Sequence, residues 1–257
     1  MANPLSVIIL AAGKGKRMNN PNLPKVMNKI DGLPLIAHVL NKLNSLNVNK
    51  KIVVVGFNKD SVIDYLNNHY RDVITVEQKE QLGTGHAVAQ AKFFFQNEDD
   101  DILILCGDVP NLSENTIKRF IDEHKKNNSQ ISVLSTTTDN PNGYGRILRD
   151  ASNNFIGIVE EKDANDNQKL ITEINGGVYM VNANLLYYAL SKISNNNAQG
   201  EYYLTDIIEI LKNEGVRTFA FNLAGFEELQ GVNTIDDLKK AEQYYFKVVG
   251  KQNDKVN

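Results

Sequence analysis

Two glycines and several cations follow directly on the first apolar run of the chain. The run 6–10 has the length of a strand, and two alanines and the sequence Gly13-Lys-Gly-Lys-Arg17 come next. Small residues let backbone N–H groups approach a phosphate closely, and cations neutralise its charge. Pro24-Lys25 adds another cation shortly afterwards. These residues predict a loop that holds a polyphosphate at the end of the first strand.

The glycine spacing matches neither of two common phosphate-binding motifs. A Walker A loop requires G-x-x-x-x-G-K-[ST], but Gly13 and Gly15 are too close together and no Ser or Thr follows a Gly-Lys pair. A dinucleotide fingerprint requires a third glycine where Met18 stands. Glycine spacing alone therefore leaves open a simple basic turn after a buried strand.

Composition bounds the class of protein. A chain of 257 residues is long enough for one large α/β domain, and 42% hydrophobic with 23% charged residues is typical of globular proteins. A net charge of −3 and a pI near 5.9 argue against nucleic-acid or anionic-membrane binding, so local groups must recognise phosphate. The single cysteine excludes an internal disulfide. No apolar run approaches ~20 residues and no secretory signal is evident, which predicts a cytoplasmic protein.

The first half of the chain alternates between two patterns. Apolar runs at 6–10, 52–56, 73–76 and 102–106 are separated by helical patterns near 34–46, 59–69, 85–95 and 113–127. This alternation predicts βα units and a largely parallel sheet, which binds ligands beyond the carboxyl ends of its strands. Gly13 and Asp108 each follow such a strand, so the phosphate loop and this carboxylate are predicted to share one rim.

The second half is more mixed and predicts some antiparallel strands. Strands are expected at 130–137, 145–149, 155–160, 174–181 and 216–222, with helices at 182–193 and 203–213. Thr234 is a predicted N-cap of a terminal helix that ends near Lys247, before a polar tail expected to fray. We expect one domain over 1–247, with halves at about 1–130 and 131–233, a helix at about 234–247 and a tail at 248–257.

Several segments together resemble one known family. Leu10–Met18 with Pro24-Lys25 resembles the signature of sugar-1-phosphate nucleotidyltransferases. Matching segments follow in order over about residues 5 to 245, namely Gln78–Ala87, Gly107–Pro110, Asn140–Ile147, Ile158–Ala164, Glu173–Gly177, Asn195–Asp206 and Gly231–Asn233. They resemble the uridyltransferase domain of the bacterial bifunctional N-acetylglucosamine-1-phosphate uridyltransferase/acetyltransferase.

The resemblance implies a fold and a reaction. The fold is a Rossmann-like, mixed but mainly parallel sheet flanked by helices, with a smaller sugar-binding lobe. The reaction is Mg²⁺-dependent transfer of UMP from UTP to N-acetylglucosamine 1-phosphate, which yields pyrophosphate and UDP-N-acetylglucosamine for peptidoglycan and lipopolysaccharide synthesis. Nucleotidyl transfer is an in-line attack between anions, so catalysis is mostly positioning and charge neutralisation.

The predicted catalytic residues are cations. The Arg17 guanidinium suits the oxygens of the departing pyrophosphate, and Lys25 suits the attacking phosphate or the α-phosphate. Asp108 is the predicted ligand of Mg²⁺, which prefers oxygen, although a turn or helix cap is the alternative interpretation. The resemblance adds Asn233 as a second metal ligand through its side-chain oxygen. Lys14 and Lys16 are interpreted as solvated; the family commonly has a neutral residue in place of Lys16.

The remaining site residues divide between nucleotide and sugar. An amide offers both a donor and an acceptor to the uracil edge, which favours Gln78 as the base-recognition residue, while His86 is interpreted as structural. The predicted nucleotide site comprises Leu10, Ala11, Ala12, Gly13, Gln78, Gly83, Thr84, Cys106 and Gly107. The resemblance implies that Gly145, Glu160 and Asn175 contact the amino sugar; a turn glycine, a solvated acid and a loop asparagine are the alternatives.

Two departures from the family limit what carries over. Gly176 replaces the usual Thr and is expected to loosen the sugar pocket. No hexapeptide repeat array follows the terminal helix, so acetyl transfer and trimer contacts do not carry over and the oligomeric state stays open. Another sugar 1-phosphate or base, such as glucose 1-phosphate or dTTP, is an alternative, as is a non-catalytic sensor. The presence of Arg17, Lys25 and Asp108 disfavours the sensor.

Overall fold

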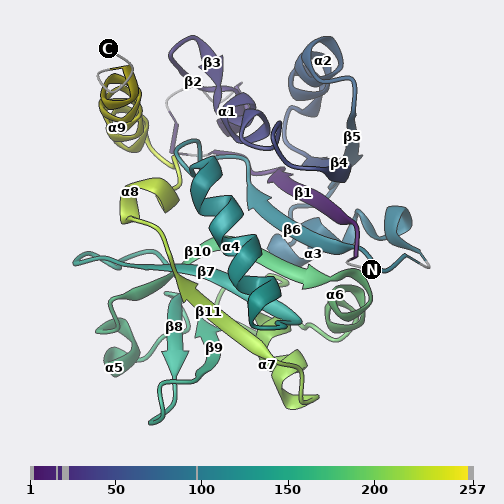
Figure 1. Ribbon diagram of the computed structural model, residues 1–257, viewed down its shortest axis with the longest axis vertical. Coiled ribbons are helices and arrows are strands. Elements are labelled where there is room, and N and C mark those ends of the chain that lie inside the picture. Colours follow the sequence, from purple (N-terminus) through teal and green to yellow (C-terminus); the bar gives the residue numbers. More distant parts are fainter. Residues whose placement is uncertain (1–2, 16, 19–22, 97, 254–257) are drawn as a thin grey trace.

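A nine-stranded sheet runs through both halves of the protein (Figure 1). The structure is a computed structural model that describes residues 3–15, 17–18, 23–96 and 98–253. The strand order is β11-β7-β10-β6-β1-β4-β5, and β8 pairs with both β10 and β9 beside this path. The bounds of these strands are β1 Leu5–Ala11, β4 Val48–Val55, β5 Val73–Glu77, β6 Asp101–Cys106, β7 Ile131–Thr137, β8 Arg146–Arg149, β9 Phe155–Val159, β10 Glu173–Asn182 and β11 Thr218–Asn222.

Helices connect many of the strands, and the last two helices follow β11. They are α1 Leu35–Asn41, α2 Lys59–His69, α3 Thr84–Ala89, α4 Glu114–Lys126, α5 Asp166–Lys169, α6 Ala183–Leu190, α7 Asp206–Asn213, α8 Phe226–Leu229 and α9 Ile235–Asn253, with 3₁₀ turns η1 Lys25–Met27 and η2 Lys92–Phe95. A separate hairpin joins β2 Lys29–Ile30 to β3 Leu33–Pro34. None of the helices in the described part of the chain is long and apolar enough to cross a bilayer.

The parallel part of the sheet places its carboxyl ends on one rim. β1 pairs in parallel with both β4 and β6, and Leu10 lies opposite Cys106 in the register. The N–H of Gly107 continues this pairing by donating to the carbonyl of Leu10 at 2.9 Å. The chain therefore leaves β1 and β6 side by side, which confirms the predicted shared rim of the phosphate loop and Asp108.

The antiparallel part of the sheet is organised around β10. β10 runs antiparallel to both β6 and β7, and a register shift between Asn175 and Val178 breaks its pairing with β7. Such a bulge bends a strand and re-aims its side chains. Because β10 enters the sheet at the end where β6 leaves it, the bulge lies at the same rim as Asp108.

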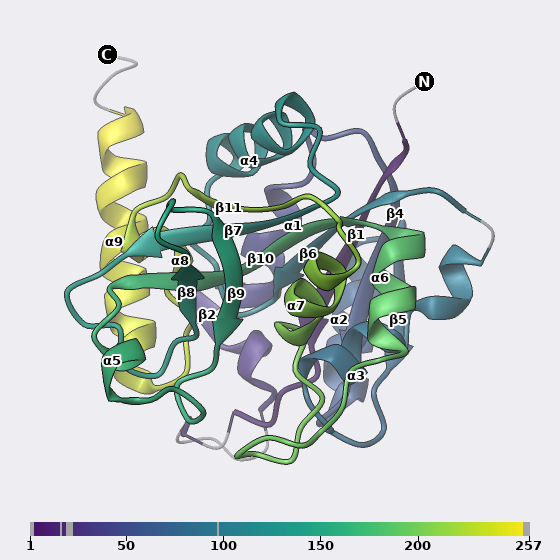
Figure 2. The same cartoon turned by 90° about the horizontal axis from the view of Figure 1, so that it is seen from below.

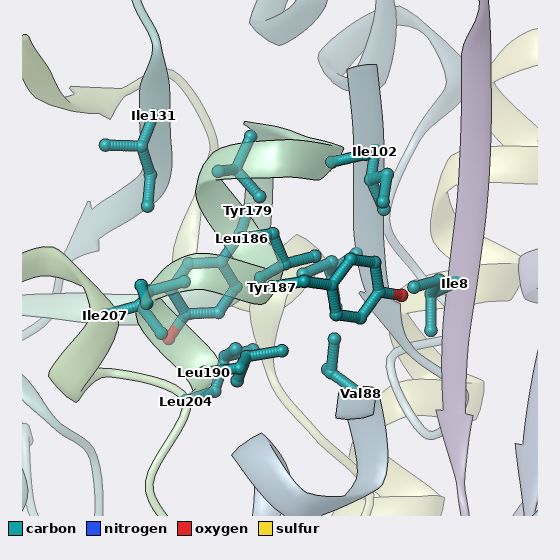
Figure 3. Close-up of a cluster of buried hydrophobic side chains, with 14 of the residues drawn as sticks. Ile8, Val88, Ile102, Ile131, Tyr179, Leu186, Tyr187, Leu190, Leu204 and Ile207 are labelled. Carbon is teal, nitrogen blue, oxygen red and sulfur yellow. The ribbon is translucent and has the colours of Figure 1, made fainter. Parts of the chain in front are cut away.

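Helices cover both faces of the sheet (Figure 2). One hydrophobic cluster joins the sheet to α1, α2 and α4, and a second joins it to α3, α6 and α7. Figure 3 shows the second cluster, to which Leu186 and Leu190 of α6 and Ile8 and Ile102 of the sheet belong. Because β1 is covered on both faces, its residues read as a continuous apolar run without alternation. The expected helix-flanked, mainly parallel fold is confirmed.

Some elements differ from their sequence-based prediction. The predicted helix over 85–95 is divided into α3 and η2, and the helix predicted over 34–46 ends at Asn41. Helix α9 continues to Asn253, so the polar tail predicted from 248 is wrong over 248–253. Thr234 does cap α9, because its hydroxyl accepts the N–H of Asp237 at 3.1 Å. The hairpin was not predicted; it turns at Asp31-Gly32 with both φ values positive, as a two-residue type I′ turn requires.

A buried histidine makes the stability of the fold depend on pH. His124 of α4 is 3% exposed, and its Nδ1 lies 2.8 Å from the Ser132 hydroxyl on β7. Burial, with a smaller contribution from Lys125, lowers the pKa of His124 from 6.5 to about 4. The unfolded chain therefore binds this proton at a higher pH than the folded protein does. The stability that the neutral ring contributes is lost as the pH falls from 6.5 towards 4.

We predict that His124→Asn removes part of this pH dependence. The free energy of unfolding of the unsubstituted protein should fall by up to ~3 kcal/mol more than that of His124→Asn as the pH is lowered through this window, at 1.36 kcal/mol per pKa unit. Urea unfolding at a series of pH values measures the difference. The exposed His69 of α2 provides the control, since His69→Asn should keep the unsubstituted slope. Equal slopes for His124→Asn and His69→Asn would contradict the prediction.

Candidate active site

A cleft of about 640 Å³ opens at the carboxyl ends of β1, β5 and β6. It contains most residues of the predicted site, namely Leu10, Ala11, Ala12, Gly13, Arg17, Lys25, Gln78, Gly83, Thr84, Cys106, Asp108 and Asn233. These residues come from four separate stretches of the chain. The fold thus brings together the predicted phosphate loop, base segment and metal ligands.

Three side chains converge at one point in the cleft. The Lys25 ammonium forms an ion pair with the Asp108 carboxylate and donates to the Asn233 side-chain oxygen at 3.0 Å. The side chains of Lys25 and Asp108 are each 16% exposed, so the pair is only partly screened by solvent. The alternative interpretation of Asp108 was a turn or helix cap. Its carboxylate faces Lys25, and the N-cap of α4 is Ser113. Two oxygens of different segments therefore share one cation.

The phosphate loop is folded tightly against Lys25. Gly15 has a φ of +58°, and a Cβ there would lie 2.9 Å from the Cβ of Lys25, so both its conformation and its surroundings require glycine. A Cβ on Gly13, by contrast, would meet nothing within 4 Å and would extend into the cleft. Gly15 shapes the loop, whereas Gly13 leaves its backbone open to a ligand.

Two further cations line the cleft. Arg17 and Lys14 are both exposed, and within the described part of the chain no residue forms an ion pair or hydrogen bond with either of them. Their charges are therefore available to an anion in the cleft. Lys16 lies outside the described residues.

Hydrogen bonds to neighbouring residues orient the side-chain amide of Gln78, the predicted base-recognition residue. Gln78 is 3% exposed, and its Nε2 donates to the carbonyl of Gly83 at 3.0 Å and lies 3.1 Å from Nδ1 of His86. A carbonyl can only accept, so this contact fixes which end of the amide is the nitrogen. Among described residues, none donates to the Gln78 side-chain oxygen. His86 thus supports Gln78 from outside the cleft lining.

The segment 197–205 closes one side of the cleft. The N–H of Tyr202 donates to the carbonyl of Leu82, and the carbonyl of Tyr202 accepts the N–H of Gly85, both at 2.8 Å. A Cβ on Gly83 would lie 2.6 Å from the backbone oxygen of Tyr202. The segments that carry Gly83 and Tyr202 are therefore in direct backbone contact. Gln199 and Glu201 of this segment line the cleft, as does Gln81. None of these three was in the predicted site.

The three predicted sugar residues meet one another beside this cleft. A Cβ on Gly145 would lie 3.5 Å from a Glu160 oxygen and 3.6 Å from the Cβ of Asn175, and the carbonyl of Gly145 accepts the N–H of Asn175 at 2.8 Å. They are not among the residues that line the 640 Å³ cleft. Cys106 joins the two regions, because its thiol donates to the carbonyl of Gly177 at 3.5 Å, and Gly177 donates to the Asn175 oxygen.

Carboxylates near Glu160 affect its protonation. Burial is the main cause that raises the pKa of Glu160, and the negative charges of Asp206, Asp163 and Glu201 add to it, while a hydrogen bond from Thr205 at 3.1 Å opposes it. Burial, followed by Glu209 and Asp163, raises the pKa of Asp206 to about 6. Burial and the neighbouring carboxylates therefore favour the protonated forms of Glu160 and Asp206 more than an exposed position would.

Two glycines that the sequence analysis singled out have closely packed surroundings. Gly107 does not line the cleft; a Cβ there would lie about 3.1 Å from Ile36 and from the Leu10 carbonyl, so it is needed for packing behind the rim. A Cβ on Gly176 would lie 2.6 Å from Leu229 and 2.7 Å from the Leu134 carbonyl. Gly176 thus faces Leu229 and the backbone of β7, and its effect on the sugar pocket stays a prediction.

The surroundings of Cys106 disfavour its thiolate form. Burial, with a contribution from the Asp108 charge, raises the pKa of the Cys106 thiol to about 12. The thiolate is therefore absent near neutral pH. Cys106 lines the cleft as a small side chain.

The described residues contain no cluster of three or more His, Cys, Asp or Glu side chains able to hold a metal by themselves. Asp108 and Asn233 nevertheless offer two oxygens to a shared cation. Mg²⁺ commonly takes only one or two protein oxygens and completes its shell with waters and substrate phosphates. The donor set is compatible with such an ion.

The chain belongs to the nucleotidyl transferase family, whose sequence pattern matches residues 6–251. A structure of UDP-glucose pyrophosphorylase complexed with UDP-glucose has the same fold, with a TM-score of 0.77 at 19% identity over 95% of this chain and 99% of that one. More particularly, the chain is a GlmU-like nucleotidyltransferase domain, which confirms the resemblance found in the sequence.

Two curated relatives support the assignment as a GlmU-like domain. The bifunctional protein GlmU of Clostridioides difficile is 44% identical over 236 residues, which cover 92% of this chain and 50% of the relative. The bifunctional protein GlmU of Desulfotalea psychrophila is 40% identical over 242 residues, which cover 94% of this chain and 70% of the relative. The chain thus spans about half the length of the first relative.

We predict that Gly83→Ala weakens nucleotide binding much more than another positive-φ glycine does. Gly83 has a φ of +113° and no room for a Cβ beside Tyr202, so the variant must separate the base segment from the segment 197–205. Gly215→Ala is the matched control, with a φ of +78° but nothing within 4 Å of its Cβ. Calorimetric titration with UTP should give a dissociation constant at least ~10-fold higher for Gly83→Ala, equivalent to 1.4 kcal/mol, and an unchanged one for Gly215→Ala. Similar affinities in both variants would contradict the prediction.

Proposed function

We propose that the domain transfers UMP from UTP to N-acetylglucosamine 1-phosphate, with release of pyrophosphate and UDP-N-acetylglucosamine. The observation that carries the proposal is the convergence of Lys25, Asp108 and Asn233 in a cleft lined by the phosphate loop. A cation and two metal-type oxygens at the end of a phosphate loop suit chemistry at a phosphorus atom. The product is a precursor of the bacterial cell envelope.

The charges of the cleft suit two anionic reactants. Arg17, free of partners among the described residues, is proposed to bind the β- and γ-phosphates and to stabilise the departing pyrophosphate. Lys25 is proposed to neutralise the charge between the attacking sugar phosphate and the α-phosphate. The sugar phosphate is already an anion, so no residue is required to remove a proton from it.

Asp108 and Asn233 are proposed to hold Mg²⁺. When bound, the ion would act as a Lewis acid that polarises phosphoryl oxygens. Both side chains now contact the Lys25 ammonium, which indicates that their oxygens already face a position favourable to a cation. The residues themselves fix that position, because they belong to two separate segments of the chain that meet at the rim of the cleft.

The base and sugar sites support the choice of substrates. The Gln78 amide points its nitrogen away to Gly83, so its oxygen is proposed to accept the N3–H of uracil, which cytosine lacks. Gly145, Glu160 and Asn175 are proposed to bind the acetamido group and hydroxyls of the sugar. One pocket contact discriminates by only ~1–3 kcal/mol, so the sugar is the part of the proposal that most needs an experiment. Because nucleoside triphosphates are held inside the cell, we also propose a cytoplasmic location.

A substrate panel tests the reaction. The purified chain is incubated with Mg²⁺, and pyrophosphate release is measured for UTP with N-acetylglucosamine 1-phosphate, UTP with glucose 1-phosphate, and dTTP with each sugar. We expect rapid release only with the first pair. Preference for another pair would move the assignment to that sugar or base. Binding of UTP without release from any pair would favour a non-catalytic sensor.

We predict that Asp108→Asn abolishes turnover without abolishing nucleotide binding. Loss of several kcal/mol of metal-assisted stabilisation corresponds to a decrease of kcat by at least ~100-fold. Affinity for UTP in the absence of metal should be retained or increased, because the variant removes a negative charge from the cleft. Asp122→Asn on the exposed face of α4 is the control and should keep full activity. Substantial turnover by Asp108→Asn would remove Asp108 from the catalytic site.

A further inference from the structure

The first turn of α9 holds the backbone of Asn233. Oδ2 of Asp237 accepts the N–H of Asn233 at 3.1 Å and the N–H of Thr234 at 2.9 Å, and Thr234 returns a bond to Asp237 through its hydroxyl at 3.1 Å. This is the reciprocal arrangement of a capping box, extended by one residue to the N–H that precedes the cap. Asp237 is thus bonded directly to the residue that supplies a cleft oxygen.

The loop that carries Asn233 is fixed at its other end by Asp108. The N–H of Val232 donates to the backbone carbonyl of Asp108 at 2.9 Å. The side-chain nitrogen of Asn233 lies 3.4 Å from the carbonyl of Gly231, which leaves its oxygen for the cleft. A Cβ on Gly231 would lie 3.5 Å from both Asp108 and Asn233, so the loop passes close to both ligands.

Helix α9 itself is anchored to the body of the protein. The side chain of Asn111 donates to the carbonyl of Ala241 at 3.0 Å, and the ring of Tyr245 packs edge-on against His38 at 5.1 Å. Val232 and Ala241 belong to one buried apolar cluster with Ile30. Because α9 is anchored in this way, a hydrogen bond from its first turn also fixes the backbone position of Asn233.

We propose that Asp237 is a positioning residue for the metal site: through the N–H of Asn233 it holds the Asn233 oxygen at the cation position that it shares with Asp108. The inference rests on the proposed function. Partners outside the ligand set orient the ligands of metal sites, and their removal typically weakens metal binding by about 10- to 100-fold. Asp237 acts only through Asn233 and touches no substrate in this scheme.

The neighbouring Asp236 provides a matched control. It is also an acid in the first turn of α9, so it makes the same type of favourable interaction with the helix dipole. Asp236 is exposed, and no described residue accepts or donates a hydrogen bond to its side chain. Asp236→Ala therefore removes one charge from the same turn without releasing Asn233, whereas Asp237→Ala does both.

The test measures metal binding separately from catalysis. Water-proton relaxation gives the affinity of the full chain for the Mn²⁺–UTP complex, and calorimetry in EDTA gives its affinity for UTP alone. We expect Asp237→Ala to weaken binding of Mn²⁺–UTP by ~10-fold or more, with UTP binding in EDTA unchanged and with Asp236→Ala unchanged in both assays. Asp237→Asn keeps an oxygen that can accept the same N–H groups and should bind Mn²⁺–UTP like the unsubstituted protein.

The outcomes separate the inference from the proposed function. Equal effects of Asp237→Ala and Asp236→Ala would overturn the inference, as would an equal loss of UTP binding in EDTA, which a merely structural role predicts. If Asp237→Ala fails to fold, a weakened Mn²⁺–UTP affinity in folded Asp237→Asn would overturn it as well. Absence of any Mn²⁺–UTP complex with the unsubstituted protein would instead refute the metal site of the proposed function, and the inference with it.

Discussion

The contact of Lys25 with Asp108 and Asn233 is the constraint on which the site depends. Each partner alone would be an incompletely paired polar group at the base of a cleft, and such groups are costly when shielded from water. The three segments that carry these residues are far apart in the sequence. Their side chains meet because β1 and β6 end at the same rim and because the loop before α9 returns to it.

The rest of the fold keeps this contact in place. A sheet covered on both faces supplies rigid strand ends, and backbone hydrogen bonds such as that from Gly107 to Leu10 and that from Val232 to Asp108 then tie loops at the rim. Leu204 shows the connection between core and site: its side chain is buried in the cluster between α6 and α7, while its N–H bonds the Thr84 hydroxyl in the cleft at 3.0 Å (Figure 3). Packing of the core therefore fixes the positions of Leu204 and, through it, of Thr84 in the cleft.

The sequence allowed the parallel half to be predicted because its strands are long apolar runs between helical patterns. The hairpin 29–34 was missed because strands of two residues carry no detectable period. Among site residues, Gly13 and Asp108 followed from their place after strands. Asn233 and the sugar residues came only from family resemblance, because an asparagine or glycine in a loop has no distinguishing pattern.

Asp237 and Gly176 show why some contacts of the site could not be predicted from the sequence. Thr234-x-x-Asp237 is a recognisable cap, but nothing in the spacing says that its carboxylate also reaches the N–H of Asn233. The direction in which Gly176 faces depends on the bulge in β10, which shifts the pairing between Asn175 and Val178. Local patterns predict elements, whereas such directions are set by contacts between distant segments.

The backbone contact of Tyr202 with Leu82 and Gly85 has a consequence for the evolution of new specificities. The same short segment bonds the base-recognition loop at Tyr202 and Glu160 at Thr205. If these sites bind sugar and base as proposed, a change that widens the proposed sugar pocket by moving Thr205 also moves the wall beside the proposed base site, so the two preferences are coupled. Descendants of this domain that accept a new sugar should thus first acquire substitutions in 201–205 that separate the two halves of this shared wall.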